Sequence, residues 1–170
     1  MSFFTVQINS IIANDPSIKS RKEAVFHPSF KAMSYYKISH YLYQHKHYIL
    51  ARIISNHAKK VTGIEIHPGA ILEDDLFIDH GSGVVIGETS IVGHGVILFH
   101  GVTLGGTGSE SGKRHPTIED NVLIGCGAKV LGNICVKKNA KIGANAVVIR
   151  DVDSNSTAVG VPARCVKKED

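Results

Sequence analysis

Two short segments of the chain hold residue types that could carry acid–base and binding chemistry. The first contains Asp79 and His80, and the second ends in Arg114 and His115. The imidazole of a histidine titrates nearest to neutral pH, so His80 could remove the proton from a weak nucleophile such as a hydroxyl group. A guanidinium such as that of Arg114 suits a carboxylate, because the two groups can form paired hydrogen bonds. The structural alternatives are a capping or surface role for His80 and solvated loop charges for Arg114 and His115.

A six-residue period predicts the scaffold that must position these segments. Aliphatic residues recur in one register after Gly63, a smaller apolar residue often follows four positions later, and glycine often comes directly after the aliphatic residue. The series consists of Ile66, Leu72, Ile78, Ile86, Val92, Leu98, Leu104, Ile118, Ile124, Val130, Val136, Ile142 and Val148. Short strands separated by bends have this pattern, and three of them close a triangular coil of about eighteen residues. We therefore expect a parallel β-helix of about four coils.

The period slips twice, and both slips contain the titratable residues. Two residues are extra between Ile78 and Ile86, and eight are extra between Leu104 and Ile118. Insertions in a solenoid leave the stack of coils and are often functional. We expect the second insertion to form a loop at 105–117.

Residues 1–62 differ in composition and are expected to be helical. They contain nine of the eleven Phe and Tyr residues and no glycine, and their apolar residues follow helical spacing. The predicted helices span about 17–25, 28–45 and 47–61, and Gly63 ends the last one as a C-cap residue. The expected organisation is a helical N-terminal region at 1–62, a β-helix at 63–166 with the loop at 105–117, and a C-terminal tail at 167–170.

Composition and charge exclude several classes of protein. The 170 residues are 43% apolar and 20% charged, which is typical of one globular domain. No apolar stretch reaches the ~20 residues of a membrane span. The start of the chain lacks a basic leader, so we expect a cytoplasmic protein that binds no membrane. The net charge of +4 could suit nucleic acid or a small phosphorylated ligand. Dispersed basic residues, with no aromatic residue after Phe99, favour the small ligand over nucleic acid.

Metal sites and a phosphate loop are not expected. The cysteines at 126, 135 and 165 lack CxxC spacing, which disfavours a disulfide framework or a zinc site. His94 and His100 are one hexapeptide apart without a third ligand in that register, so a solenoid face is the favoured interpretation over a metal site. The glycine-rich segment at 105–108 lacks the Gly-Lys-Ser/Thr ending of a P-loop.

The chain resembles the serine O-acetyltransferase family over nearly its whole length. The stretches that carry the resemblance are YKISHYL at 36–42, GIEIHPGA at 63–70, FIDHG at 77–81, VVIGET at 84–89, VTLGGTG at 102–108 and KRHP at 113–116, together with Asp15-Pro16. The resemblance implies a left-handed parallel β-helix with a helical N-terminal region. It also implies an enzyme that transfers the acetyl group of acetyl-CoA to L-serine, giving O-acetyl-L-serine and CoA for cysteine biosynthesis.

The resemblance also implies catalytic roles for two residues. His80 would be the general base, and Glu65 would be the carboxylate that orients it, at a position where many members carry aspartate. Fifteen residues separate Glu65 from His80, which is close to one coil, so the two can lie in adjacent layers.

Four residues would hold the amino acid. Arg114 and His115 match the groups that bind it, and Asp15 and Asp79 match carboxylates that recognise serine through its ammonium group. For Asp15 an N-cap before Pro16 is the structural alternative.

The resemblance places the pantetheine arm of CoA along the solenoid, near Gly106, Thr107, Cys126 and Ala144. Small residues there permit a close approach of the ligand to the backbone. For Cys126 the favoured interpretation is a small wall residue rather than a reactive thiol.

The resemblance further implies a homotrimer or a dimer of trimers, with the active site between subunits. It also implies a complex with cysteine synthase through a tail that ends in isoleucine, and the ending Lys167-Lys168-Glu169-Asp170 argues against that complex. Two alternative functions stay open. One is an O-acetyltransferase that acts on homoserine or another small hydroxyl acceptor, and the other is a non-catalytic solenoid that binds a partner enzyme.

Overall fold

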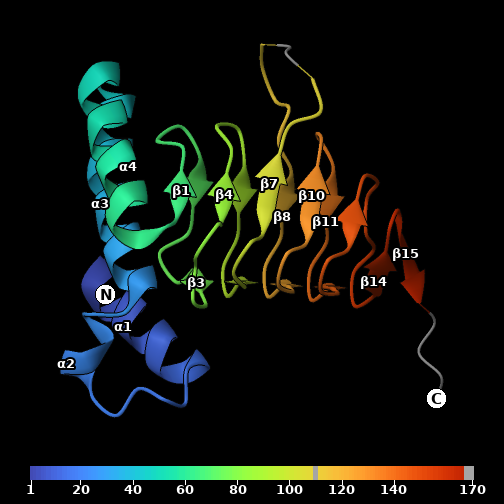
Figure 1. The fold of residues 1–170 in the computed structure, drawn as a ribbon, viewed down its shortest axis with the longest axis horizontal. Helices are drawn as coiled ribbons and strands as arrows, with labels where there is room; N and C mark the ends of the chain where they lie inside the picture. The colour runs from blue at the N-terminus through green and yellow to red at the C-terminus, as the bar shows by residue number, and fades with distance from the viewer. Residues whose placement is uncertain (109–110, 167–170) are drawn as a thin grey trace.

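Four helices stand at one end of a stack of short strands (Figure 1). The computed structural model describes residues 1–108 and 111–166. The helices are α1 (Phe3–Asn14), α2 (Arg21–Ala24), α3 (Pro28–Gln44) and α4 (Tyr48–Thr62). Among the described residues, none of the helices has the length and apolar character needed to cross a bilayer.

The strands form three parallel sheets that the chain visits in turn. Their bounds are β1 Glu65–Ile66, β2 Ile71–Leu72, β3 Phe77–Ile78, β4 Val85–Ile86, β5 Ile91–Val92, β6 Ile97–Leu98, β7 Thr103–Gly105, β8 Thr117–Ile118, β9 Leu123–Ile124, β10 Lys129–Leu131, β11 Cys135–Val136, β12 Lys141–Ile142, β13 Val147–Val148, β14 Thr157–Gly160 and β15 Ala163–Val166. Sheet A has the order β1-β4-β7-β10-β13, sheet B has β11-β8-β5-β2, and sheet C has β15-β14-β12-β9-β6-β3. Among the described strands, only the pair β14–β15 is antiparallel. The predicted fold, a left-handed parallel β-helix behind a helical N-terminal region, is confirmed.

The aliphatic series found in the sequence forms the core of the solenoid. Each of its members lies in one of the strands β1 to β13, and none is more than 5% exposed. Burying such a side chain contributes about 1.5–3 kcal/mol. The stack is longer than the four coils expected, because Val152 bridges to Val136 and β14 pairs with β12 in a partial fifth coil.

The helices cover the open end of the first coil. Polar side chains on their buried faces bond to backbone groups that an edge strand would leave unpaired. The Tyr36 hydroxyl donates to Ala70 O at 2.7 Å and accepts from Leu72 N at 3.2 Å. From α4, Ser55 Oγ donates to Ile66 O at 2.7 Å. The helical region therefore closes the solenoid and fixes the position of its first coil.

The helix expected at 17–25 is only the short α2, and α1 was not predicted. In α1 the side chain of Gln7 donates to Leu76 O at 3.0 Å, and Ser10 Oγ donates to Asp75 O at 2.7 Å. These two residues lie on the face that packs against the first coil, so polar side chains stand where apolar ones would mark a helix. The other two helices lie within one residue of their expected bounds at either end, and Gly63 ends α4 with a φ of 73°.

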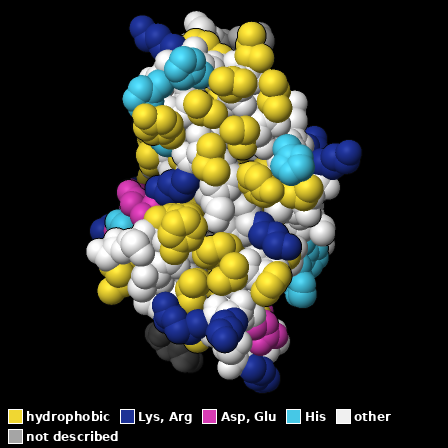
Figure 2. All heavy atoms as spheres, turned by 90° about the vertical axis from the view of Figure 1, so that its left-hand side faces the viewer, with side chains coloured by type: hydrophobic (Ala, Val, Ile, Leu, Met, Phe, Trp, Pro, Cys, Tyr) yellow, Lys and Arg dark blue, Asp and Glu magenta, His cyan; other side chains and the backbone are white. Residues whose placement is uncertain are grey.

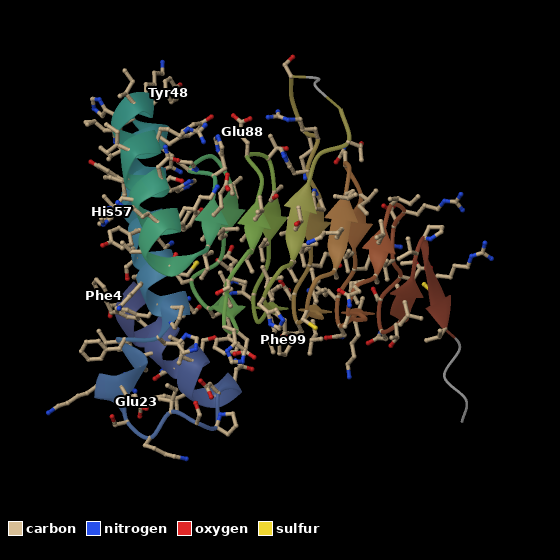
Figure 3. All side chains as sticks on the ribbon, in the orientation of Figure 1. Phe4, Glu23, Tyr48, His57, Glu88 and Phe99 are labelled. Atoms are coloured by element: carbon tan, nitrogen blue, oxygen red, sulfur yellow. The ribbon has the colours of Figure 1, made fainter. Side chains whose placement is uncertain are left out.

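Two rows of bends border sheet A. We call the bends that lead from sheet C into sheet A the C–A edge, and those that lead from sheet A into sheet B the A–B edge. In Figure 3, Phe99 marks the C–A edge and Glu88 marks the A–B edge, at opposite ends of the strands. The insertion after β7 leaves the stack at the A–B edge (Figure 1).

Candidate active site

A cavity of about 480 Å³ lies at the C–A edge, where the helical region meets the end of β3. Its lining consists of Asn14, Asp15, Pro16, Ser17, Ile18, His27, Pro28, Asp79 and His80. This volume falls in the range of small-molecule sites. Three of the residues singled out in the sequence, Asp15, Asp79 and His80, thus share one cavity.

His80 stands at the centre of a tight turn formed by the first register slip. Its φ of 57° is in the left-handed region, and the Gly81 N–H closes the turn on Asp79 O at 2.6 Å. The His80 side chain is 77% exposed, with Nε2 at 4.0 Å from Asp79 Oδ1. Glycine is required at position 81, because an added Cβ would lie 2.4 Å from Ile64 Cδ1. The turn thus places the imidazole outside the stack of coils, where it lines the cavity.

Asp15 follows α1, accepts one hydrogen bond and has an imidazole nitrogen close to its other oxygen. The Ser17 N–H donates to Asp15 Oδ1 at 2.9 Å, and His27 Nε2 lies 3.6 Å from Asp15 Oδ2. The hydrogen bond from Ser17 lowers the pKa of the Asp15 carboxyl below its usual value. No helix begins at Pro16, so the N-cap alternative for Asp15 is wrong.

His27 is a cavity residue that sequence reasoning missed. The residue is only 9% exposed and lines the cavity. Burial lowers the pKa of its imidazole, so the ring is neutral near pH 7. The available signal was its place directly before Pro28, the first residue of α3.

Glu65 begins β1, beside the C–A edge, and its carboxylate pairs with Lys59 Nζ of α4 at 2.6 Å. The Glu65 side chain is 40% exposed. Among the described residues, no hydrogen bond or ion pair joins Glu65 to His80. The structure therefore places Glu65 beside the same edge as His80, with its carboxylate paired to Lys59.

Arg114 and His115 lie at the A–B edge, where Thr89 organises both. The backbone N–H groups of Arg114 and His115 donate to Thr89 Oγ1 at 3.0 and 3.1 Å. With both lone pairs so used, the Thr89 hydroxyl directs its own proton to His115 Nδ1, 2.9 Å away. The His115 ring then carries its proton at Nε2. Burial, followed by the charge of Arg114, lowers the pKa of His115 and keeps the ring neutral near pH 7.

Glu88 ties the Arg114 side chain to the helical region. Arg114 Nη2 donates to Glu88 Oε2 at 2.5 Å, and the hydroxyl of Tyr43, from α3, donates to Glu88 Oε1 at 2.9 Å. These two hydrogen bonds lower the pKa of the Glu88 carboxyl, against the opposing effect of its burial. A further cavity of about 360 Å³ beside this contact is lined by Tyr43, Glu88, Thr89 and Lys113 among others.

The residues expected to contact CoA also divide between the two edges. Cys126, a half-buried free cysteine, and the exposed Ala144 follow β9 and β12 on the C–A edge. Gly106 and Thr107 follow β7 on the A–B edge. An added Cβ on Gly106 would lie 3.3 Å from Arg114 O, so the small residue lets the two ends of the insertion meet.

The candidate residues therefore divide into two groups at the two edges of sheet A, and we call these groups half-sites. His80, Asp15, Asp79 and Glu65 belong to the C–A edge, whereas Arg114 and His115 belong to the A–B edge. The two edges are separated by the width of sheet A. The four residue steps from Val84 to Glu88 correspond to a distance of about 13 Å along the strand direction.

No cluster of three or more metal-binding side chains occurs within the described parts of the chain. His94 and His100 do not share a solenoid face, because they follow β5 and β6 and so lie in different rows of bends. Two carboxylates from the first coil stand beside His94. Its Nδ1 lies 3.2 Å from Asp75 Oδ1, and its Nε2 lies 3.4 Å from Glu73 Oε2.

Comparison with known proteins identifies related chains. Residues 115–150 match the family model described as bacterial transferase hexapeptide (six repeats). The chain is 48% identical to a serine acetyltransferase of Helicobacter pylori over 163 residues, which is 95% of each chain. The chain belongs to the serine acetyltransferase family. It is also 50% identical to the Synechococcus elongatus member, of whose length it spans 64%.

Solved members of the serine acetyltransferase family have the same fold. A Brucella abortus serine acetyltransferase in complex with coenzyme A superimposes with a TM-score of 0.93 at 40% identity, over 96% of this chain and 66% of that one. A Neisseria gonorrhoeae member in complex with serine superimposes with a TM-score of 0.93 at 40% identity, over 97% of this chain and 68% of that one. Both the resemblance drawn from the motifs and the fold class are thereby confirmed.

Proposed function

We propose that this chain transfers the acetyl group of acetyl-CoA to the hydroxyl of L-serine, giving O-acetyl-L-serine and CoA for cysteine biosynthesis. Membership of the family supports the reaction, as do solved relatives in complex with serine and with CoA. The observation that carries the proposal is the cavity in which His80 stands beside two carboxylates, those of Asp15 and Asp79.

His80 is the general base of the proposed reaction. Its imidazole accepts the proton of the serine hydroxyl as the oxygen attacks the thioester carbonyl carbon. The new C–O bond forms, the C–S bond breaks, and the imidazolium returns the proton to the departing sulfur of CoA. Glu65 would stabilise the imidazolium after exchanging its contact with Lys59, which is open to solvent and thus easily broken.

The acceptor is recognised by charges at both of its ends. Asp15 and Asp79 attract its ammonium group, and ionised Asp15 is available for this because its pKa is lowered. Arg114 pairs with its carboxylate, and His115 donates from Nε2. Glu88 and Thr89 hold these two residues in place.

The separation of the half-sites supports a homotrimer as the active unit. We propose that the C–A edge of one copy faces the A–B edge of the next, so that serine and the pantetheine arm lie between copies. Cys126 and Ala144 would come from one copy, and Gly106 and Thr107 from the other. Contacts between two different surfaces of identical chains close into a ring, and three triangular prisms can close in this way.

A second trimer would pack on the outer face of the helices. Figure 2 shows hydrophobic side chains gathered on this face. Ile38 and Tyr41 of α3 and Ile49 and Ile53 of α4 are more than half exposed there. Light scattering distinguishes the two assemblies, because a trimer has three times and a dimer of trimers six times the 18.3 kDa mass of one chain.

We place the enzyme in the cytoplasm, and its three free cysteines at 126, 135 and 165 suit a reducing compartment.

The ending Lys167–Asp170, which bears on a complex with cysteine synthase, lies outside the described residues.

A steady-state assay of CoA release with serine, homoserine and threonine tests the proposed function. We expect the highest kcat/KM with serine, and mass spectrometry should identify O-acetylserine as the product. One methylene discriminates by only ~1–3 kcal/mol, so homoserine is the stringent comparison. A higher kcat/KM with homoserine, or no CoA release with any acceptor, would contradict the proposal.

A further inference from the structure

A buried histidine at the start of α3 lines the cavity. His27 is the N-cap residue of α3, and its Nδ1 accepts the Ser29 N–H at 3.2 Å. A neutral imidazole has one nitrogen that accepts and one that donates. Because Nδ1 accepts, the ring proton is at Nε2, and Nε2 faces Asp15 Oδ2 at 3.6 Å.

Two contacts connect the start of α3 to the strand that precedes the His80 turn. The His27 ring packs on the Phe77 ring with centroids 5.5 Å apart. Ser29 Oγ, from the second residue of α3, accepts the Ile78 N–H at 3.1 Å. Phe77 and Ile78 form β3, which leads directly into Asp79 and His80. The start of α3 is therefore joined to the strand that presents the proposed base.

No regular element fixes the Asp15 carboxylate, since Asp15 follows the last residue of α1. Its orientation therefore depends on neighbouring side chains and backbone groups. Ser17 N–H holds one carboxylate oxygen at 2.9 Å, and His27 Nε2–H faces the other. A group that is already oriented loses less conformational freedom when a ligand binds. A neutral donor also leaves the full negative charge of Asp15 available, which a lysine or arginine at position 27 would offset.

We propose that His27 is a positioning residue, whose Nε2–H holds the Asp15 carboxylate in the orientation that receives the ammonium group of the amino-acid acceptor. The inference rests on the proposed function, because it requires Asp15 to bind that ammonium group. His27 itself does not touch the reacting atoms.

Two substitutions separate positioning from helix capping. His27→Asn keeps a side-chain acceptor for the Ser29 N–H but loses the donor toward Asp15. His27→Gln keeps an N–H donor near the place of Nε2 but loses the acceptor for Ser29. We expect His27→Asn to raise the KM for serine about five- to tenfold, with kcat and the KM for acetyl-CoA within about twofold of wild type. We expect His27→Gln to keep the serine KM within about threefold of wild type while lowering Tm more than His27→Asn does.

The order of the two variants decides the inference. If His27 only stabilised the fold, the variant with the lower Tm would have the higher KM for serine. His27→Gln would then be the worse enzyme, and this result would overturn the proposal. An unchanged serine KM in His27→Asn would also overturn it.

Asp15→Asn distinguishes this failure from failure of the proposed function. If Asp15→Asn raises the serine KM and His27→Asn does not, only the role of His27 is wrong. If Asp15→Asn leaves the serine KM unchanged, the proposed role of Asp15 is wrong, and the inference falls with it. If both act as expected, adding His27→Asn to Asp15→Asn should raise the KM no further, because the two substitutions remove one contact.

Discussion

His80 and Arg114 lie at opposite edges of sheet A, so a single chain does not place the proposed base beside the proposed carboxylate-binding group. The base shares its cavity with Asp15 and Asp79, whereas the guanidinium is held by Glu88. Each edge is locally complete, with its own hydrogen bonds and its own contacts to the helical region. In the proposed homotrimer, the two edges would form one site between neighbouring copies.

The first prediction concerns the base. His80→Ala should lower kcat roughly 10²- to 10⁴-fold, because general-base catalysis contributes that much. The affinity for acetyl-CoA should stay close to that of wild type, since the substitution removes no proposed CoA contact. Steady-state kinetics and calorimetric titration of acetyl-CoA measure the two quantities. Turnover within about threefold of wild type would rule out His80 as the base.

The second prediction concerns the acceptor carboxylate. Arg114→Ala should reduce kcat/KM for serine by about 2–4 kcal/mol, because a charge-assisted bidentate contact is lost. Calorimetry should find the Kd of acetyl-CoA nearly unchanged. The opposite outcome, weaker acetyl-CoA binding with normal serine affinity, would assign Arg114 to a CoA phosphate instead.

The third prediction concerns the hydroxyl group that organises the insertion. Thr89→Val removes the acceptor of two backbone N–H groups and the proton donor to His115 Nδ1. We expect a loss of about 1–3 kcal/mol in kcat/KM for serine, together with a lower Tm. Thr89→Ser keeps the hydroxyl and is the matched control. Equal kinetics for the valine and serine variants would show that this hydroxyl does not position His115.

The fourth prediction concerns pH and follows from the lowered pKa of Glu88. A carboxyl group whose pKa is lower in the folded state binds more protons when unfolded, so its contribution to stability rises with pH. The contribution of Glu88 should therefore be full above its ordinary pKa of 4.5 and disappear as the pH falls through the lowered value. Thermal unfolding of wild type and Glu88→Gln from pH 7 to pH 3 measures this, and the difference in Tm should shrink only at the acid end.

Tyr43→Phe is the control for that measurement. It removes the second hydrogen bond to Glu88 and should reduce the pH dependence without abolishing it, because the contact with Arg114 has the larger effect on the pKa. A Tm difference between wild type and Glu88→Gln that is constant down to pH 3 would contradict the assignment.

The solenoid could be predicted from the sequence because its period is local and repeats many times. Every member of the aliphatic series occupies a strand, since a two-residue strand with one inward side chain leaves little freedom of register. In α1 the same reasoning fails. The face of α1 that packs on the solenoid mixes the buried Ile11 with Gln7 and Ser10, which bond to backbone groups of the first coil, and the polar residues interrupt the apolar periodicity.

The residues proposed for the site come from the sequence, whereas their contacts in the fold could not be predicted from it. The two insertions identify His80 and Arg114, and the order of strands within a coil assigns them to different edges. No sequence pattern reveals that Glu65 pairs with Lys59, because that contact depends on how α4 packs against β1. His27 escaped notice for a similar reason, since its partners lie in α1 and β3.

Mixing two inactive variants tests the central claim most directly. Serine acetylation should be negligible for His80→Ala alone and for Arg114→Ala alone. After the two are unfolded together and refolded at equal concentrations, about a quarter of the interfaces should pair an intact His80 with an intact Arg114 from the neighbouring copy. We predict that CoA release with serine recovers to about a quarter of the wild-type rate. A mixture that stays as inactive as its components, while co-refolded wild type regains its rate, would contradict a site shared between copies.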